Sequence, residues 1–318
     1  MNKNYAINYM NKNDKDLKNN KNKYVCIFLI SARKELLKKS LYFLNENYNK
    51  SYNHDIIIFY HGSKYDSNEF RMSIKNINKK TNYIFEKLEY KLPSNIKEKD
   101  LFYNRRNIPY VHYSFPKSRI GYLHANFFWN NFMNLKQLEK YNYLIRIDDD
   151  SWFKKKLNFN LFDKLEDSKK LCGTGYIWNH LHHRVLDTRI NFYNWIKYYV
   201  KKYNINVKSN ELKESLKEGE KDIIDNRVCN KKFHCMKMLS GNFNLYNRKL
   251  FNSKEWKNYN KEFNDYGGGY KYRWGDCEVI SMFYYIHIGD SFLDLDLKNQ
   301  DIYVNALPET NMIKNGLS

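Results

Sequence analysis

Two apolar runs near the start of the chain enclose a segment with helical spacing. Residues 24–30 and 55–60 are almost entirely apolar, which is typical of buried strands. Between them, leucines from position 36 to position 44 recur at helical intervals. This order predicts a βαβ unit and therefore a parallel sheet with a right-handed crossover. Ligands bind at the carboxyl ends of such strands, so we expect residues 31–33 and His61 at a ligand-binding rim.

A third apolar run, residues 143–147, leads directly into Asp148, Asp149 and Asp150. Three adjacent carboxylates repel one another and need a compensating cation or exposure to solvent. Because alternate residues of an extended chain face the same way, Asp148 and Asp150 are placed to share one ion while Asp149 points elsewhere. Mn²⁺ and Mg²⁺ prefer such oxygen ligands. A solvated acidic turn is the alternative interpretation.

The segment between residues 120 and 140 predicts a helix rich in aromatic residues. Phe128, Phe132 and Leu135 recur at the spacing of a core-facing stripe. Tyr122 and His124 lie at the start of this helix, where we expect them to face a ligand.

Further elements follow the acidic cluster. Residues 157–165 suggest a strand or turn, 173–178 a strand, 190–207 an amphipathic helix, and 209–226 a charged, exposed helix or insertion. Three histidines after the strand are a weaker alternative metal site: His180, His182 and His183.

The most distinctive later segment is a glycine triplet, residues 267–269, followed by Arg273-Trp274-Gly275-Asp276 and Glu278. Glycines permit positive φ and close approach of the backbone. The apolar run 279–288 then predicts a buried helix, and an acidic residue at its start is favoured by the helix dipole. Asp276 as the helix N-cap is one interpretation. The other is the wall of a sugar site, where aromatic faces cover a pyranose and carboxylates accept its hydroxyl protons.

Composition favours a globular α/β protein. The 318 residues are 42% hydrophobic and 17% aromatic, which excludes a largely disordered chain. We expect a disordered Asn/Lys-rich tail over residues 1–22 and a single domain over residues 23–318. No apolar stretch is long enough to cross a membrane, so the chain is expected to be soluble. Five cysteines show no disulfide framework, and Cys229 and Cys235 are either a local disulfide or free thiols.

The formal charge of +20 attracts polyanions. Lysines are spread along the whole chain, and no nucleic-acid-binding motif accompanies them. An attraction to anionic nucleotide sugars, or solubility alone, therefore explains the charge better than specific binding to nucleic acid.

Together these motifs resemble the fungal α-1,2-mannosyltransferase family, which extends mannan and O-linked chains in the Golgi. That family reads Tyr-Tyr-Trp-Arg-Val-Glu-Pro-Asp where this chain has Tyr143-Leu-Ile-Arg-Ile-Asp-Asp-Asp150. Its later block, Gly-Gly-Phe-Phe-Tyr-Glu-Arg-Trp-Gly-Asp, is similar to residues 268–276 here. An opening Val-Arg-Asn-Ser-Glu-Leu resembles residues 31–36.

The resemblance implies a GT-A-like fold, with a central, mostly parallel sheet flanked by helices. It also implies Mn²⁺ (or Mg²⁺), GDP-mannose as donor and transfer with retention of anomeric configuration. Asp148 matches a metal-binding position and Arg33 a nucleotide contact. Tyr122 matches a donor-side Tyr, and Asp276 an Asp that lines the sugar site.

Two departures from the family pattern bear on mechanism. The family's Ser-Asn-Phe-Glu-Ile, whose Glu is a proposed nucleophile, corresponds to Gly241-Asn-Phe-Asn244-Leu here. Asn is not a carboxylate nucleophile, so front-face attack, another acid or an inactive protein are the open alternatives. A metal-binding His near the family's C-terminus has no clear counterpart, and Asp150 is a candidate replacement.

We therefore expect a metal-dependent retaining glycosyltransferase that moves a hexose, most simply mannose, to a hydroxyl of an oligosaccharide or glycoprotein. The predicted metal ligands are Asp148 and Asp150. The predicted donor-binding residues are Arg33, Tyr122, His124, Arg146 and Trp274. The predicted catalytic residues are Asp276, Glu278 and Asn244. A silent carbohydrate- or nucleic-acid-binding protein, or use of another nucleotide sugar, are the alternatives. Compartment (cytoplasm, viral factory, or Golgi by family analogy) and oligomeric state are left open.

Overall fold

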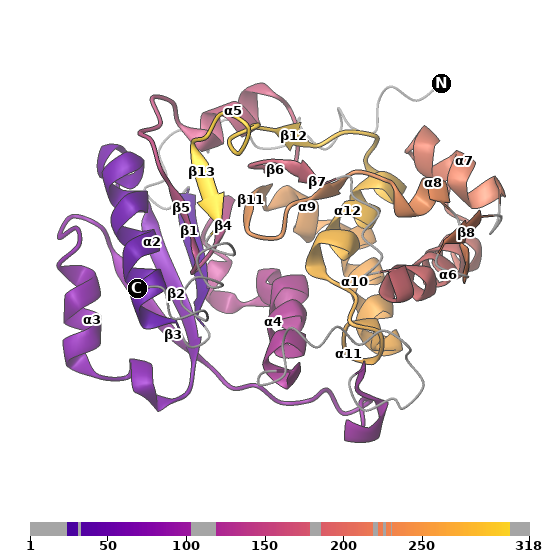
Figure 1. Cartoon of the computed structure of the whole chain (residues 1–318), viewed down its shortest axis with the longest axis horizontal. Coiled ribbons are helices and arrows are strands. Elements are labelled where there is room, and N and C mark those ends of the chain that lie inside the picture. The colour runs from indigo at the N-terminus through magenta and orange to yellow at the C-terminus, as the bar shows by residue number, and fades with distance from the viewer. Residues whose placement is uncertain are drawn as a thin grey trace.

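A computed structural model describes residues 24–30, 33–102, 119–178, 186–218, 222–224, 227–229 and 231–305. Its centre is a seven-stranded sheet in the order β12-β6-β11-β4-β1-β2-β3 (Figure 1). The strands of this sheet are β1 (Tyr24–Ile30), β2 (Asp55–His61), β3 (Tyr83–Leu88), β4 (Tyr143–Asp148), β6 (Cys172–Thr174), β11 (Phe243–Asn247) and β12 (Leu293–Asp294). Neighbouring strands pair in parallel except at β11, which is antiparallel to both β4 and β6.

Three two-stranded pairs accompany the sheet, all antiparallel. They are formed by β5 (Ser151–Phe153) with β13 (Tyr303–Asn305), β7 (Ile177–Trp178) with β10 (Met238–Leu239), and β8 (Asp222–Ile224) with β9 (Arg227–Cys229). The helices are α2 (Lys34–Asn47), α3 (Asn68–Lys75), α4 (Arg119–Asn131), α5 (Leu161–Asp167), α6 (Leu186–Lys202), α7 (Asn210–Glu218), α8 (Lys231–His234), α9 (Lys249–Asn252), α10 (Lys254–Tyr266), α11 (Gly268–Lys271) and α12 (Asp276–His287).

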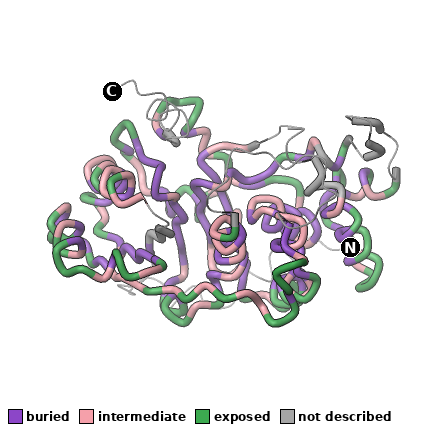
Figure 2. The backbone as a smooth tube through the Cα atoms, turned by 60° about the horizontal axis from the view of Figure 1, so that its bottom comes forward, coloured by how far each residue is buried: buried purple, intermediate pink, exposed green. Residues whose placement is uncertain are grey.

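Helices cover both faces of the sheet, and a large hydrophobic core lies on each face. One core lies under α2, α3 and α5, and the other under α4, α6, α10 and α12. Alternate residues of β2 enter different cores, because successive side chains of a strand point to opposite faces. Figure 2 shows the buried backbone concentrated in the central strands and the exposed segments along the outer helices and loops. This is the α/β architecture with a mostly parallel sheet that the sequence predicts.

The same alternation fixes the orientation of β4. Ile145 and Ile147 belong to the core under α2, whereas Leu144 belongs to the core under α12. Arg146 therefore lies on the face that α12 covers. This position brings a charged side chain beneath the helix that begins at Asp276.

Several predicted boundaries need correction. The segment 157–165 was expected to be a strand or turn, but Leu161–Asp167 is a helix. The side chain of Asn160 accepts a hydrogen bond from the backbone N–H of Phe162 at 2.9 Å, and this cap starts the helix. The segment 173–178 divides into β6 and β7. The helix expected from 190 to 207 runs from Leu186 to Lys202.

Two other predicted helices are also shorter or displaced. The helix expected between 120 and 140 ends at Asn131 and is followed by two 3₁₀ turns. In the charged segment 209–226, the described residues form the helix Asn210–Glu218 and strand β8, which pairs with β9. The apolar run 279–288 does form a helix, which begins three residues earlier than expected, at Asp276.

The glycine triplet behaves as its composition predicts. Gly267 has a φ of 75° and ends α10 in the left-handed conformation that glycine adopts most readily. Gly268 lies so close to Trp274 that a Cβ atom would overlap the indole ring. Both positions therefore require glycine, for conformation at the first and for close packing at the second.

Some expectations fall outside the described residues: the tail over residues 1–22 and the histidines His180, His182 and His183. The domain boundary near residue 23 therefore stays a prediction. Cys172, Cys235 and Cys277 are free thiols. In the part of the chain that the structure describes, no helix is both long and apolar enough to cross a bilayer.

Candidate active site

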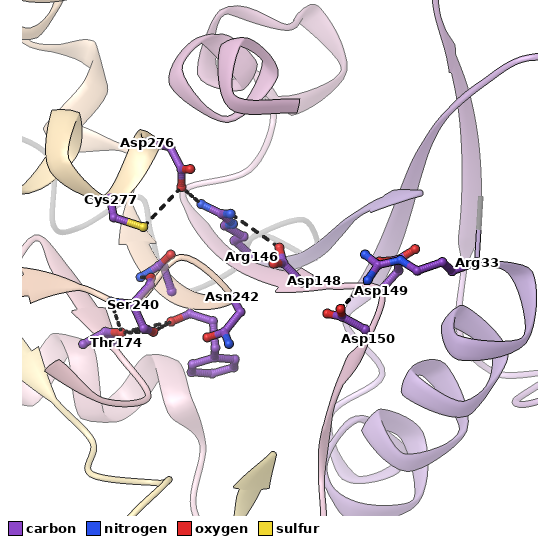
Figure 3. Close-up of polar contacts among 12 residues, drawn as sticks. Arg33, Arg146, Asp148, Asp149, Asp150, Thr174, Ser240, Asn242, Asp276 and Cys277 are labelled. Atoms are coloured by element: carbon purple, nitrogen blue, oxygen red, sulfur yellow. Dashed lines mark hydrogen bonds and ion pairs between the residues drawn. The ribbon is translucent and has the colours of Figure 1, made fainter. Parts of the chain in front are cut away.

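The carboxyl ends of β1 and β4 lie side by side, and the parallel register pairs Leu29 with Asp148. Arg33 follows β1 at the start of α2. Its guanidinium group forms ion pairs with Asp149 and Asp150 (Figure 3). The acidic segment is thus partly neutralised by an arginine at the start of α2, which meets the need of adjacent carboxylates for a cation. Arg33 was expected at this rim, but its contact with the aspartates was not.

Arg146 makes the second connection. It is only 4% exposed, yet it contacts carboxylates from two different elements. Its Nη1 pairs with Oδ2 of Asp276, and its Nη2 lies 3.4 Å from Oδ1 of Asp148. The guanidinium carbon lies 4.1 Å from the ring centre of Trp129, close enough for a cation–π contact. Arg146 therefore joins the acidic end of β4 to the start of α12.

The first turn of α12 supplies two further acids. Asp276 and Glu278 both lie in it, where the helix dipole favours negative charge. Asp276 is not the N-cap: Gly275 occupies that position, and no side chain caps the helix there. A Cβ atom on Gly275 would collide with the carboxylate of Glu278. The absence of a side chain at residue 275 thus leaves space for Glu278 to fold back over the helix start.

Tyr122 lies beside this helix start. The guanidinium carbon of Arg273 lies 4.6 Å from the centre of its ring. Burial raises the pKa of Tyr122; Arg273 lowers that pKa, and the charges of Asp276 and Glu278 raise it. Arg273 has a φ of 60°, an uncommon conformation for a residue with a side chain. The structure therefore brings together the Tyr122, Asp276 and Glu278 that the sequence predicts and adds Arg273 to them.

His124 has a different environment. Nδ1 of His124 lies 2.9 Å from the hydroxyl of Tyr270, and its ring stacks on Tyr90 with a centroid distance of 4.9 Å. The ring of Tyr90 also stacks with that of His61, at a centroid distance of 4.8 Å. Burial and the charge of His61 lower the pKa of His124. Among the described residues, His124 contacts this aromatic stack rather than the carboxylates.

Trp274 was expected to present its ring to a sugar, and this expectation needs correction. Its side chain is 1% exposed. Tyr266 and Tyr272 stack against it at centroid distances of 5.4 and 5.5 Å, and Phe192 and Trp195 of α6 pack nearby. The ring belongs to the core and holds the Arg273–Asp276 segment in place instead of forming an open platform.

Asn244 lies in the middle of the sheet, directly opposite Arg146 in the antiparallel pair of β11 and β4. It is 1% exposed, and its Nδ2 donates a hydrogen bond to the carbonyl of Ser240 at 2.7 Å. The side chain is therefore close to the Arg146 ion pairs, and its own amide is engaged with the backbone.

Sequence reasoning missed Tyr176 and Asn242. The carbonyl of Asn242 accepts hydrogen bonds from the N–H of Asp148 at 3.0 Å and from the hydroxyl of Tyr303 at 2.9 Å. Nδ2 of Asn242 lies 3.5 Å from the hydroxyl of Tyr176. Burial raises the pKa of Tyr176, and Asp148 and Cys277 add to the effect. Because β6 runs parallel to β4, the residues that follow β6 reach the same rim as Asp148. The direction of β6 in the sheet is therefore the feature that could have indicated Tyr176.

The carboxylates carry more charge than their arginine partners neutralise. Burial raises the pKa of Asp148 to about 6; Asp150 and Asp276 add to the shift, and Arg146 opposes it. Burial likewise raises the pKa of Asp149 to about 7 against the effect of Arg33. The three aspartates of 148–150 and Asp276 face two arginines, so two formal negative charges remain, which one divalent cation would balance.

The residues fit a divalent ion of this kind. Asp148 and Asp150 offer oxygen ligands, and Oδ1 of Asp150 is buried without a hydrogen-bond partner among the described residues. Within the described ranges, no three His, Cys, Asp or Glu side chains are grouped closely enough to hold a metal by themselves. A site with one or two protein carboxylates, completed by substrate phosphates, is a common arrangement for Mg²⁺.

The fold and the acidic rim define the class of protein: a GT-A-like nucleotide-sugar transferase. The sequence pattern of the glycolipid 2-alpha-mannosyltransferase family matches residues 1–293. The chain therefore belongs to this family and is a glycosyltransferase of the alpha-mannosyltransferase type. This finding favours an enzyme over a silent binding protein. No curated protein matches the sequence.

Solved structures support the same fold. The mannosyltransferase Ktr4p from S. cerevisiae superposes with a TM-score of 0.68 at 19% identity, over 90% of this chain and 70% of that one. Core-mannan synthase A (CmsA/Ktr4) from Aspergillus fumigatus, in an Mn/GDP form, gives a TM-score of 0.67 at 16% identity over 93% and 78% of the two chains. A GDP complex of Ktr4p gives 0.66 at 19% identity, over 90% and 71%.

Proposed function

We propose that this protein transfers a mannosyl group from GDP-mannose to a hydroxyl of an oligosaccharide or glycoprotein, with retention of anomeric configuration. The observation that carries the proposal is the connection of Asp148, at the end of the central strand, through Arg146 to Asp276. In this proposal Asp148 binds the metal and Asp276 faces the sugar, and Arg146 contacts both carboxylates. The Mn/GDP form of the Aspergillus fumigatus enzyme supports the donor and the metal.

In this proposal Asp148 and Asp150 hold Mn²⁺ or Mg²⁺. The ion, when bound, would neutralise the charge that develops on the departing diphosphate. The side chain of Arg33 is 38% exposed and forms ion pairs with Asp149 and Asp150. Its exposed part is free to face solvent and the diphosphate, so a nucleotide contact is compatible with its ion pairs.

The sugar side is formed by the start of α12 and the residues beside it. Asp276 and Glu278 accept hydrogen bonds from sugar hydroxyls in this proposal, because ionised carboxylates are strong acceptors. Tyr122 and Arg273 lie next to them and face the donor. Together they orient the sugar ring between the helix start and the acidic rim, a positioning effect that lowers the barrier to transfer.

For the bond changes we propose the front-face alternative, because this chain has Asn244 where the family has its proposed nucleophile. Asn244 has no carboxylate, so a covalent glycosyl-enzyme at this position is excluded. The acceptor oxygen attacks the anomeric carbon from the face that the diphosphate leaves, and the C–O bond to the diphosphate breaks. The proton of the acceptor hydroxyl passes to the departing diphosphate oxygen. No protein base is needed, and the anomeric configuration is retained.

A panel of nucleotide sugars, assayed with and without Mn²⁺, tests the proposal. We expect Mn²⁺-dependent turnover of GDP-mannose and an α-linked product by NMR. Asp148→Ala combined with Asp150→Ala should abolish metal-dependent hydrolysis of the donor. Unchanged hydrolysis in this double variant would refute the proposed metal site, and turnover of a different nucleotide sugar alone would refute the donor.

A further inference from the structure

We propose that Arg146 is a positioning residue that holds Asp276 in register with Asp148 and contacts no nucleotide itself. This inference rests on the proposed function and deepens it. It replaces the expectation that Arg146 binds the donor. The residue would act on catalysis through the two carboxylates that it joins, one from β4 and one from α12.

The burial of Arg146 separates it from the donor. Its side chain is 4% exposed, and its guanidinium group lies over the indole of Trp129 at 4.1 Å. Its place in β4 directs it into the layer between the sheet and α12. Arg33, which is 38% exposed, has access to solvent that Arg146 lacks. A direct contact with a bound nucleotide would require Arg146 to leave this buried position.

The chemistry of the pair explains why an arginine is needed. A charge this deeply buried is stable only when it is paired. The guanidinium group offers several N–H donors in a fixed plane, so one residue reaches two carboxylates in a defined geometry, whereas a lysine provides a single point charge. Nη1 is directed at Asp276 and Nη2 at Asp148. The separation of the two acids is thus set by one rigid group.

The surrounding chain leaves room for this pair. A Cβ atom on Gly241 would lie 3.8 Å from Nη2 of Arg146 and 4.0 Å from Oδ2 of Asp276, and it would collide with Sγ of Cys277. Across the sheet, Asn244 presents a neutral amide that is bonded to Ser240. No carboxylate competes from position 244, so Asp276 is free to serve as the partner of Arg146.

Three possible roles of Arg146 predict different results for Arg146→Met. A nucleotide contact would weaken the affinity for GDP in the presence of Mn²⁺. A purely structural role would lower Tm and leave kcat unchanged when the variant is assayed well below its Tm. A positioning role should lower kcat about 10- to 100-fold, as is typical when a residue that orients a ligand is lost. GDP affinity should then be retained or slightly tighter, since a positive charge near the metal ligands is removed.

The experiment compares Arg146→Met, Arg146→Lys, Asp276→Asn and the double variant Arg146→Met/Asp276→Asn. Arg248→Met is the matched control, because Arg248 is a half-buried arginine bonded to the carbonyl of Leu138. We measure Tm, kcat, KM and the GDP affinity with Mn²⁺. The double variant should lose no more kcat than the worse single variant, since both remove the same connection. Arg248→Met should lower Tm only.

Arg146→Lys keeps the positive charge, so it tests the inference even if Arg146→Met does not fold. We expect it to fold and to show an intermediate kcat, because an ammonium group cannot bridge both acids in the same geometry. Wild-type kcat in Arg146→Lys or Arg146→Met, or a large loss of GDP affinity in either variant, would overturn this inference but not the proposed function. Failure of the unmodified enzyme to bind GDP with Mn²⁺ would instead overturn the proposed function.

Discussion

Asn244 of β11 and Arg146 of β4 are directly opposite each other in an antiparallel pair, and both are almost completely buried. The family pattern has a Glu where this chain has Asn244, and that Glu would add a third carboxylate beside an arginine that already contacts two. In this chain the arginine pairs with Asp276 and Asp148, and residue 244 is a neutral amide. The charge of Arg146 is therefore balanced by carboxylates of α12 and of β4 itself, and not by a residue of the paired strand β11.

The first prediction concerns Asn244 itself. Asn244→Ala removes the hydrogen bond from Nδ2 to the carbonyl of Ser240 and leaves that buried acceptor unpaired. We expect a stability loss of about 1–3 kcal/mol and turnover that remains measurable, because the proposed reaction forms no bond to residue 244. Urea unfolding and steady-state assays check the two quantities. A glycosylated protein seen by intact-mass spectrometry in the unmodified enzyme, and absent from the variant, would contradict the prediction.

The second prediction separates the adjacent aspartates. Asp148 faces Arg146, whereas Asp149 is turned toward Arg33 (Figure 3). Asp148→Asn should weaken Mn²⁺-dependent GDP binding about 10- to 100-fold or more. Asp149→Asn should leave that binding largely intact, and its effect on stability near neutral pH should be small, since burial raises the pKa of Asp149 to about 7. Calorimetric titration of both variants with GDP and Mn²⁺ provides the comparison. Equal losses in the two would be incompatible with this division of roles.

Much of the sheet was predictable because its strands are continuous apolar runs that end abruptly at polar residues. Residues 24–30, 55–60 and 143–147 are of this kind, and all three form neighbouring strands. The short helix Leu161–Asp167 was missed, because seven residues give little periodicity and its start depends on the Asn160 cap. Local pattern alone does not distinguish such a helix from a turn.

The site was predictable as a set of residues but not as a set of contacts. The sequence places Arg33 and the aspartates at one rim, yet only the structure pairs Arg33 with Asp149 and Asp150. The burial of Trp274 depends on Phe192 and Trp195, which come from a helix some eighty residues earlier. Packing between such distant segments leaves no trace in the local sequence around Trp274.

The third prediction uses the backbone of Arg273. Because its φ is 60°, replacement by glycine removes backbone strain of about 1 kcal/mol along with the side chain. Arg273→Gly should therefore keep or slightly raise Tm. If the arginine faces the donor as proposed, kcat/KM for the donor should fall about 10- to 100-fold, the equivalent of a charge-assisted hydrogen bond of 1.5–3 kcal/mol.

Arg273→Lys is the matched control for that variant. It keeps the positive charge and the backbone strain, so Tm should remain near that of the unmodified protein and kcat/KM should lie between the two. Wild-type kcat/KM in Arg273→Gly would show that the cation beside Tyr122 does not act on the donor.

The last prediction concerns the stability of the protein in acid and a histidine outside the candidate active site. His54 is 7% exposed; its Nε2 is 3.2 Å from the hydroxyl of Tyr48, and burial lowers its pKa to about 4. The unfolded chain binds a proton at His54 below about pH 6.5, whereas the folded protein does so only near pH 4. His54 therefore does not change the free energy of unfolding with pH above pH 6.5. As the pH falls from 6.5 toward 4, protonation of His54 in the unfolded chain lowers the free energy of unfolding by up to about 3 kcal/mol.

Urea unfolding at pH 7 and pH 5 measures this contribution. The unmodified protein should lose stability between the two conditions, and His54→Gln should lose distinctly less. A smaller pH dependence should persist in the variant, because burial also lowers the pKa of His287 to about 4. An identical loss in His54→Gln and the unmodified protein would show that a proton on His54 does not drive the destabilisation.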